Sequence, residues 1–236
     1  MVLASSGCRG PSRSAPQTYA ERTFRGRQLR FAGRLWRARG MSTVAPSGAG
    51  PNYWSDAPEQ LWVDEAGRLH LRLAQHRGRW RAVELFTPLR RPYFEVSFEL
   101  DSPVARLDPN VVVGLFVYRS DQSEVDVEFA RWGDAAAPNA QFALAPVTSP
   151  GHRRRFRWRP GGGRSRHSIR WTSAGLELES KGQGGAQFRH RWAGKGLLSE
   201  RPHGVHINLW LAGGEAPRDG RPVELIVRDV TITPAP

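Results

Sequence analysis

Cysteine, lysine and long apolar runs are scarce in this 236-residue chain. Its one cysteine, Cys8, excludes an internal disulfide framework and a zinc site built from cysteines. No segment approaches the roughly 18 apolar residues that a membrane-spanning helix needs, so no transmembrane segment is expected. Only Lys181 and Lys195 are lysines, and the formal net charge of +13 is therefore carried by arginine.

Turn-forming and aromatic residues are plentiful instead, with 25 glycines, 18 prolines and nine tryptophans. This composition favours strands and turns over a helical bundle. Short apolar or alternating stretches recur between turn signals at the intervals typical of a sandwich, at 62–63 with 69–73, 94–100, 111–118, 156–158, 169–171, 205–209 and 222–232. The length suits one all-β domain, and we expect no helix and no internal repeat.

The first part of the chain differs from the rest. Residues 1–27 are rich in Ser, Arg, Pro and Gly, which predicts a disordered basic tail before a domain at 28–236. Residues 2–8 resemble the end of a bacterial lipoprotein signal, with Cys8 as the residue to be lipidated. Secretion or lipid anchoring at Cys8 is expected if the upstream half of such a signal is missing, and a cytoplasmic protein otherwise. The alternative is a non-native or simply disordered extension.

Three acidic residues carry the most chemical information. Side chains alternate across a strand, so Glu124, Asp126 and Glu128 share one face of the segment 123–129. Carboxylates this close cannot all ionise freely, and at least one pKa should rise. A carboxylic acid beside an ionised carboxylate is what glycoside hydrolysis requires. The plain alternative is a half-exposed strand whose outer face happens to be acidic.

The segment Glu124-Val-Asp126-Val-Glu128-Phe resembles the signature of glycoside hydrolase family 16, the lichenase and laminarinase group. Further segments resemble family strands in the same order along the chain: Ala82-Val-Glu-Leu, Val113-Gly-Leu-Phe-Val-Tyr, Ala140-Gln-Phe, Ser168-Ile-Arg-Trp-Thr and Val205-His-Ile-Asn-Leu-Trp. The resemblance spans about residues 50–232. It implies a single-domain jelly-roll sandwich of two antiparallel sheets with a concave substrate groove.

The resemblance also implies an activity. We expect a retaining, endo-acting hydrolase or transglycosylase of a β-linked polysaccharide, most simply a β-1,3 or mixed-linkage glucan. Glu124 corresponds to the nucleophile, Glu128 to the general acid/base and Asp126 to the residue that holds the nucleophile. Neither a cofactor nor a metal is implied, and a monomer is expected.

Several other positions match sugar-binding residues of the family. The positions expected to bind hydroxyl groups are Glu84, Tyr118, Gln141 and Asn208, with Trp210 as a stacking face and Trp132 and Asn52 as weaker candidates. Where many members carry a polar residue two positions after the Gln, this chain has Ala143. Where the family usually has a Tyr-Gly turn, it has Arg90-Arg91-Pro92-Tyr93. Some subsites are therefore expected to be trimmed or basic.

Two other functions compete with the hydrolase. One is a non-catalytic glycan-binding module on the same fold, which would gain nothing from crowded carboxylates. The other is nucleic-acid binding by the stretch 153–159, in which arginines alternate with Phe156 and Trp158. We interpret that stretch as an exposed edge hairpin with its aromatic residues inside, so that serine at positions 153–155 leaves glycan turnover nearly unchanged. No nucleic-acid partner is expected.

Overall fold

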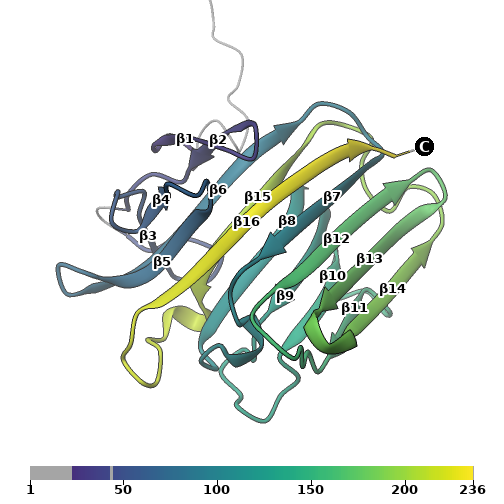
Figure 1. The fold of residues 1–236 in the computed structure, drawn as a ribbon. Helices are drawn as coiled ribbons and strands as arrows, with labels where there is room; N and C mark the ends of the chain where they lie inside the picture. Colours follow the sequence, from purple (N-terminus) through teal and green to yellow (C-terminus); the bar gives the residue numbers. More distant parts are fainter. Residues whose placement is uncertain (1–22, 43–44, 236) are drawn as a thin grey trace, which may run out of the picture.

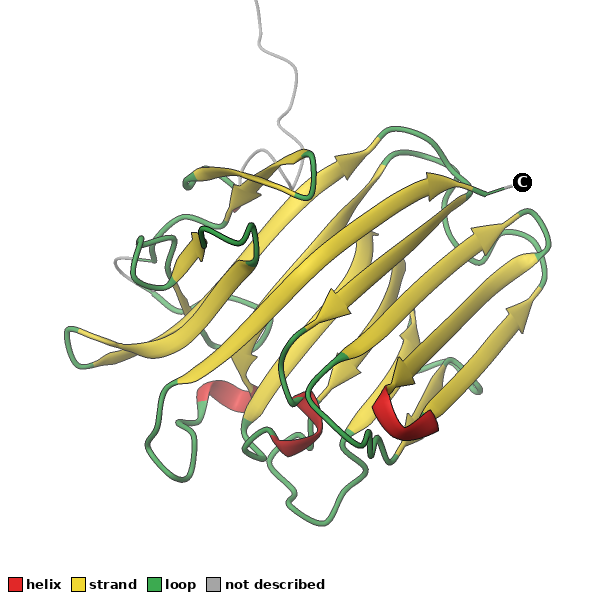
Figure 2. Cartoon of the chain, viewed as in Figure 1, coloured by secondary structure: helices red, strands yellow, loops and turns green. Residues whose placement is uncertain are grey.

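The computed structural model describes residues 23–42 and 45–235 of the chain, and the regular secondary structure of these residues is almost entirely β-strand (Figure 2). Cys8 and most of the predicted tail lie outside the described residues. Three single-turn 3₁₀ segments connect strands, at Val104–Arg106, Gln183–Gly185 and Ala212–Gly214. Within the described ranges, no helix is long and apolar enough to cross a membrane.

The strands stack in two layers, front and rear in Figure 1. The rear sheet runs in the order β11 (Arg153–Phe156), β10 (Ala140–Leu144), β9 (Ser123–Phe129), β8 (Val111–Ser120), β15 (His203–Leu211) and β6 (Arg79–Leu89). The front sheet runs in the order β5 (Leu69–His76), β16 (Val223–Pro234), β7 (Phe94–Leu100), β12 (Ser165–Thr172), β13 (Gly175–Gly182) and β14 (Gln187–Ala193). Every pairing along this path is antiparallel, which confirms the predicted all-β sandwich.

The two sheets are joined along one edge. Residues 74–76 of β5 pair with residues 79–81 of β6, so hydrogen bonding continues from one layer into the other. Four short strands complete this edge: β1 (Gln28–Phe31), β2 (Arg34–Ala38), β3 (Tyr53–Trp54) and β4 (Leu61–Val63). β2 adds to β6 of the rear sheet, and β4 adds to β5 of the front sheet.

The core lies between the layers and is built by period-two alternation. On β9, Val125, Val127 and Phe129 point into the core and are fully buried, while the acidic residues between them are half-buried on the other face. β8 is buried on both faces from Val111 to Val117, as its unbroken apolar sequence predicts. The rear sheet therefore has a dry face toward the front sheet and a polar face turned away from it.

The packed chain begins earlier than residue 28. Phe24 is only 3% exposed, with its ring 4.5 Å from that of Phe86 and 5.3 Å from that of His206. The Gly26 amide donates a 3.0 Å hydrogen bond to the Ala38 carbonyl, which attaches the incoming chain beside β2. We therefore place the start of the domain at Phe24, because a polar, arginine-rich context hid this one buried aromatic residue.

Removing residues 1–22 is expected to leave the melting temperature unchanged, whereas removing residues 1–25 is expected to lower it. Phe24→Ala should cost about 3 kcal/mol, because a buried aromatic side chain is lost, and should lower the Tm by roughly 5–10 °C. Differential scanning calorimetry of the parent, the two deletions and Phe24→Ala measures the Tm of each protein. Equal Tm values for the two deletions would show that Phe24 contributes no packing energy.

Candidate active site

Cross-strand register on the polar face of the rear sheet brings the predicted residues into rows. The first row crosses five strands in the order Gln141, Glu128, Gly114, Asn208 and Glu84. Directly paired residues have Cβ atoms about 5 Å apart. Four predicted site residues, which span 124 positions of the sequence between Glu84 and Asn208, are therefore near neighbours in space.

Two further rows lie beside the first. Asp126 is opposite Phe116, which is opposite His206, and Glu124 is opposite Tyr118. The His206 ring stacks on Phe116 with ring centroids 4.8 Å apart, and its Nδ1 lies 3.2 Å from Glu84 Oε1. An aromatic floor therefore separates the acidic residues of β9 from the edge of the sheet at β6.

Two adjoining cavities meet at the acidic residues, and together we call them the groove. The first, the Glu84 cavity, has a volume of about 480 Å³; beside Glu124, Asp126 and Glu128 it is lined by Arg39, Gly48, Ala49, Glu84, Gly114, Phe116, Tyr118, Asp121, Asn208 and Trp210. The second, the arginine cavity, has a volume of about 590 Å³; beside the same three acids it is lined by Asp121, Trp132, Gln141, Ala143, Ala145, Val147, Arg153, Arg155 and Trp210. The three carboxyl groups thus lie in the middle of a groove that extends to both sides.

The electrostatics of the three acidic residues are those of a crowded, desolvated cluster. Burial and repulsion from Glu128 raise the pKa of Glu124 from its ordinary 4.5 to about 8. Burial raises the pKa of Asp126 well above its usual range, and repulsion from both glutamates adds to this. A hydrogen bond between the two carboxyl groups raises the pKa of Asp126 further and counteracts part of the rise in the pKa of Glu124, as expected when Asp126 is the donor and Glu124 the acceptor.

Glu128 has a different environment. Burial raises its pKa to about 7, while a hydrogen bond from Gln141 and the charge of Arg155 oppose the rise. Gln141 Nε2 donates to Glu128 Oε2 over 2.6 Å, and Arg155 Nε donates to Gln141 Oε1 over 3.3 Å. Gln141 is therefore oriented by Arg155 and in turn fixes the carboxyl group of Glu128.

Glu84 is held by two partners that sequence reasoning missed. Arg39 Nη1 forms a 2.9 Å ion pair with Glu84 Oε2, and His206 approaches the other oxygen. The Arg39 guanidinium also lies 4.2 Å from the ring centre of Trp54. No local signal in the sequence marks Arg39, because it reaches Glu84 only through the pairing of β2 with β6.

The remaining predicted binding residues divide into two groups. Asn208 is 5% exposed, and its Oδ1 accepts no hydrogen bond from the described residues. A Cβ atom at the facing Gly114 would clash with that oxygen, so glycine leaves the amide its space. Trp210 lines both cavities, and its ring meets that of Trp132 edge-on at 5.9 Å and 61°. These three side chains border the groove, as does Tyr118, whose hydroxyl donates to Asp121 over 2.9 Å.

Asn52 is not brought to the groove surface, contrary to its prediction as a sugar ligand. Its amide donates to the carbonyls of Ala49 and Leu211, each over 2.9 Å, and its oxygen accepts from the Leu211 amide over 3.0 Å. Both N–H groups of the side-chain amide, and one of the two acceptor positions of its oxygen, are therefore occupied by backbone groups. Asn52 ties the loop that carries Gly48 and Ala49, which do line the Glu84 cavity, to the end of β15.

The basic stretch 153–159 is an edge strand and its continuation, with Phe156 and Trp158 buried as expected. Its arginines are not all remote from the site, however. Arg155 pairs with Gln141 and Arg153 with Ala143, so both share the polar face and line the arginine cavity. Serine at position 153 or 155 is therefore expected to change glycan turnover, which differs from the expectation drawn from the sequence.

No protein-family model matches the chain, and no curated protein matches it in sequence. Solved structures do match its fold. A β-1,3-glucanase from Mycobacterium marinum superimposes with a TM-score of 0.60 at 17% identity, over 84% of this chain and 90% of that one. A non-specific endo-β-1,3(4)-glucanase from family GH16 gives 0.60 at 16% identity, over 84% and 83%. A pseudo β-1,3-glucanase of Mycobacterium tuberculosis gives 0.60 at 16% identity, over 85% and 91%.

The fold is that of glycoside hydrolase family 16. At these identities the likeness establishes the architecture, and the chemistry has to be argued from the groove itself. Among residues 23–42 and 45–235, no group of three or more His, Cys, Asp or Glu side chains is arranged to hold a metal ion.

The raised pKa values predict how stability depends on pH. Above pH 4.5 the unfolded chain releases the proton of Glu124, whereas the folded chain keeps it until about pH 8. The folded state then binds more protons than the unfolded state, so the free energy of unfolding falls as the pH rises through this window. Glu124→Gln removes the titration and should be more stable than the parent at pH 8, by on the order of 2 kcal/mol.

Thermal unfolding of the parent and of Glu124→Gln between pH 4 and pH 9 measures this difference. The two curves should converge near pH 4, where both states of the parent are protonated. Glu65→Gln is the matched control, because Glu65 is exposed on a turn away from the groove. A pH-independent offset between parent and Glu124→Gln would contradict the raised pKa.

Proposed function

We propose that this protein is a retaining, endo-acting hydrolase or transglycosylase of a β-linked polysaccharide, with a β-1,3 or mixed-linkage glucan as the expected backbone. One observation carries the proposal: three carboxyl groups with raised pKa values share one strand face in the middle of a groove. A cavity on each side of these acids suits a chain that is cut internally, because sugar units can then bind on both sides of the cleaved bond.

The partners of each acid, and not the order of the pKa values, distinguish the proposed roles: Glu124 accepts a hydrogen bond from Asp126, and Glu128 is held by Gln141. Turnover requires the state in which Glu124 is ionised and Glu128 is protonated. Glu128, with its pKa raised to about 7, is protonated in about half of the molecules at neutral pH, and this form protonates the glycosidic oxygen as its bond to the anomeric carbon breaks. The ionised form of Glu124, stabilised by the hydrogen bond from Asp126, attacks the anomeric carbon and forms a covalent glycosyl-enzyme. Glu128, now a carboxylate, then takes the proton of a water or sugar hydroxyl, whose oxygen displaces Glu124 and restores the starting state.

Neighbouring side chains are assigned to sugar binding. Asn208 lines the Glu84 cavity, where its side-chain amide suits a sugar hydroxyl, and Glu84 is held in place by Arg39 to accept a hydrogen bond from another. Trp210 lines both cavities next to the acids, where an indole face supports the apolar face of a pyranose ring. Gln141 is assigned to Glu128, since its amide is already bonded to that carboxyl group.

A non-catalytic glycan-binding module is the second candidate. The observation in its favour is that one structural neighbour is described as a pseudo β-1,3-glucanase, so this architecture does not guarantee turnover. Against it stands the energetic cost of the acidic cluster: burying three mutually repelling carboxyl groups destabilises the fold at neutral pH. Binding alone offers no compensation for that cost.

Glu124→Gln and Glu128→Gln are each expected to lower kcat by about 10³-fold or more while the circular dichroism spectrum stays native, since neither side chain packs in the core. Azide should restore turnover of an activated glycoside to Glu124→Ala, because an external nucleophile replaces the missing carboxylate. The assays are reducing-end release from laminarin, lichenan, agarose, carrageenan and xyloglucan. Activity retained by both Gln variants would refute the hydrolase.

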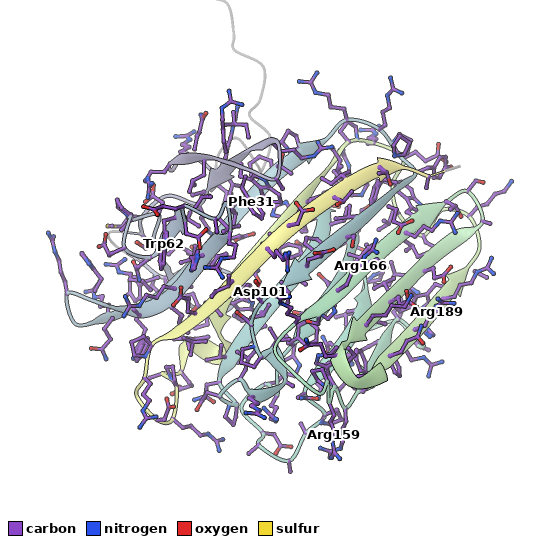
Figure 3. The ribbon with its side chains drawn as sticks, viewed as in Figure 1. Phe31, Trp62, Asp101, Arg159, Arg166 and Arg189 are labelled. Carbon is purple, nitrogen blue, oxygen red and sulfur yellow. The ribbon has the colours of Figure 1, made fainter. Side chains whose placement is uncertain are left out.

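Trp210→Ala should weaken glycan binding roughly tenfold through loss of the stacking face. The matched control is Trp62→Ala, because Trp62 stacks on His70 on the front sheet, outside the groove (Figure 3). Isothermal titration of an inactive Glu124→Gln background with oligosaccharides measures both. Equal losses from the two tryptophan variants would show that Trp210 acts through stability and not through contact with sugar.

A further inference from the structure

Two arginines of β11 stand in the groove without acidic partners. Arg153 and Arg155 line the arginine cavity, and neither forms an ion pair with any carboxylate of the described residues. Arg155 donates one hydrogen bond, from Nε to Gln141, which leaves its terminal nitrogens available. Both residues are exposed along the edge strand, so their guanidinium groups are accessible from the groove.

Some arginines elsewhere on the surface have ionic or hydrogen-bonding partners. Arg189 on β14 bonds Glu179 over 2.6 Å and approaches Glu177 at 3.3 Å. Arg166 on β12 donates to Ser97 over 2.6 Å. Figure 3 labels these two arginines on the front sheet, whereas Arg153 and Arg155 belong to the rear sheet. The pair on β11 is distinguished from other arginines by its place, because it lines the same cavity as the three acidic residues of β9.

The surroundings of the pair offer no substitute for a carboxylate. Arg153 and Arg155 lie two positions apart on one strand face, roughly 7 Å apart at Cα, so like charges are held close together. The floor between them and the acidic residues includes Ala143, Ala145 and Val147, which carry no polar side chain. Asp121 also lines this cavity, but its carboxylate accepts a hydrogen bond from the Tyr118 hydroxyl and forms no ion pair with either arginine.

We propose that the arginine cavity binds an anionic substituent, a carboxylate or a sulfate, on the sugar units that lie on that side of the cleaved bond. This rests on the proposed function and narrows its substrate to an acidic polysaccharide or an acidic decoration of a β-glucan. A guanidinium group presents a planar fork of donors that matches the oxygens of carboxylate and sulfate. Ala143 and Ala145 provide the space that a substituent on the ring requires.

The geometry also links recognition to the reacting groups. An anion seated between Arg153 and Arg155 is adjacent to the hydrogen-bonded series from Arg155 through Gln141 to Glu128. Arg154 on the same strand faces the opposite way, since it pairs with the core residue Phe142. Arg154 is therefore a matched control for Arg153, because it is also an exposed arginine of β11 but lies on the other face of the strand.

The test compares polysaccharides that differ only in charge. Laminarin and sulfated laminarin, together with curdlan and carboxymethyl-curdlan, are titrated into the inactive Glu124→Gln protein at fixed ionic strength. We expect at least tenfold tighter binding of a charged member of a pair. The sulfated and carboxymethylated arms distinguish sulfate from carboxylate as the preferred group.

Arg153→Ser should reduce the ratio of charged to neutral affinity about tenfold, as expected for the loss of a charge-assisted hydrogen bond. Arg153→Lys should keep part of the ratio, Arg153→Glu should reverse it, and Arg154→Ser should leave it unchanged. Equal affinity for charged and neutral polymers, no binding of either, or an equal effect of Arg154→Ser would overturn the proposal. Thermal melts exclude unfolding as the cause of any loss.

The last titration adds a single-stranded oligonucleotide to the same Glu124→Gln protein. If it binds more tightly than any charged glycan and depends on Arg153, the cavity serves a nucleic acid and the proposal is wrong. Turnover is measured separately with the active protein. Charge-selective, Arg153-dependent binding without hydrolysis of any polymer would support the acidic ligand while refuting the hydrolase, so the two failures are distinguishable.

Discussion

Crowding of three carboxyl groups on one face of β9 is the constraint to which the rest of the groove responds. Period-two alternation places Glu124, Asp126 and Glu128 on the same side, and the apolar residues between them fix β9 in the core so that the acids cannot move apart. Desolvation then raises the pKa of each acid, and repulsion adds to the rise for Glu124 and Asp126. Side chains from neighbouring strands offset part of this repulsion. Gln141 donates a hydrogen bond to Glu128, and further along the same row Arg39 neutralises Glu84.

The same constraint connects stability with chemistry. Carboxyl groups that stay protonated in the folded state reduce the free energy of unfolding at neutral pH, and proteins retain such costs mainly where function requires them. The cost is borne by a two-layer core whose strands are buried on the side facing the other sheet. The groove is also asymmetric about the acids. Its Glu84 side is internally neutralised, whereas its arginine side presents unpaired positive charge, and this asymmetry is what suggests an acidic ligand.

Much of the architecture follows from local pattern. Alternation predicted the two faces of β9, the unbroken apolar run predicted a doubly buried β8, and the residues of β15 resembled a family strand closely enough to mark Asn208 and Trp210. Features that depend on pairing between distant segments could not be predicted. Asn52 has the chemistry of a sugar ligand, but its side chain bonds the backbone of Leu211, 159 positions away. Likewise, the basic stretch alternates in sequence, yet only the register of β11 with β10 shows which of its arginines face the groove.

The assignment of Glu124 as the nucleophile is the central claim, and covalent trapping tests it most directly. The protein is incubated with an activated 2-deoxy-2-fluoro glycoside of the sugar that it turns over, digested with protease and analysed by tandem mass spectrometry. The account predicts one added glycosyl group per chain, attached to Glu124 and absent from Glu124→Gln. A label on Glu128 or on another residue, or turnover of the glycoside without any covalent intermediate, would contradict it.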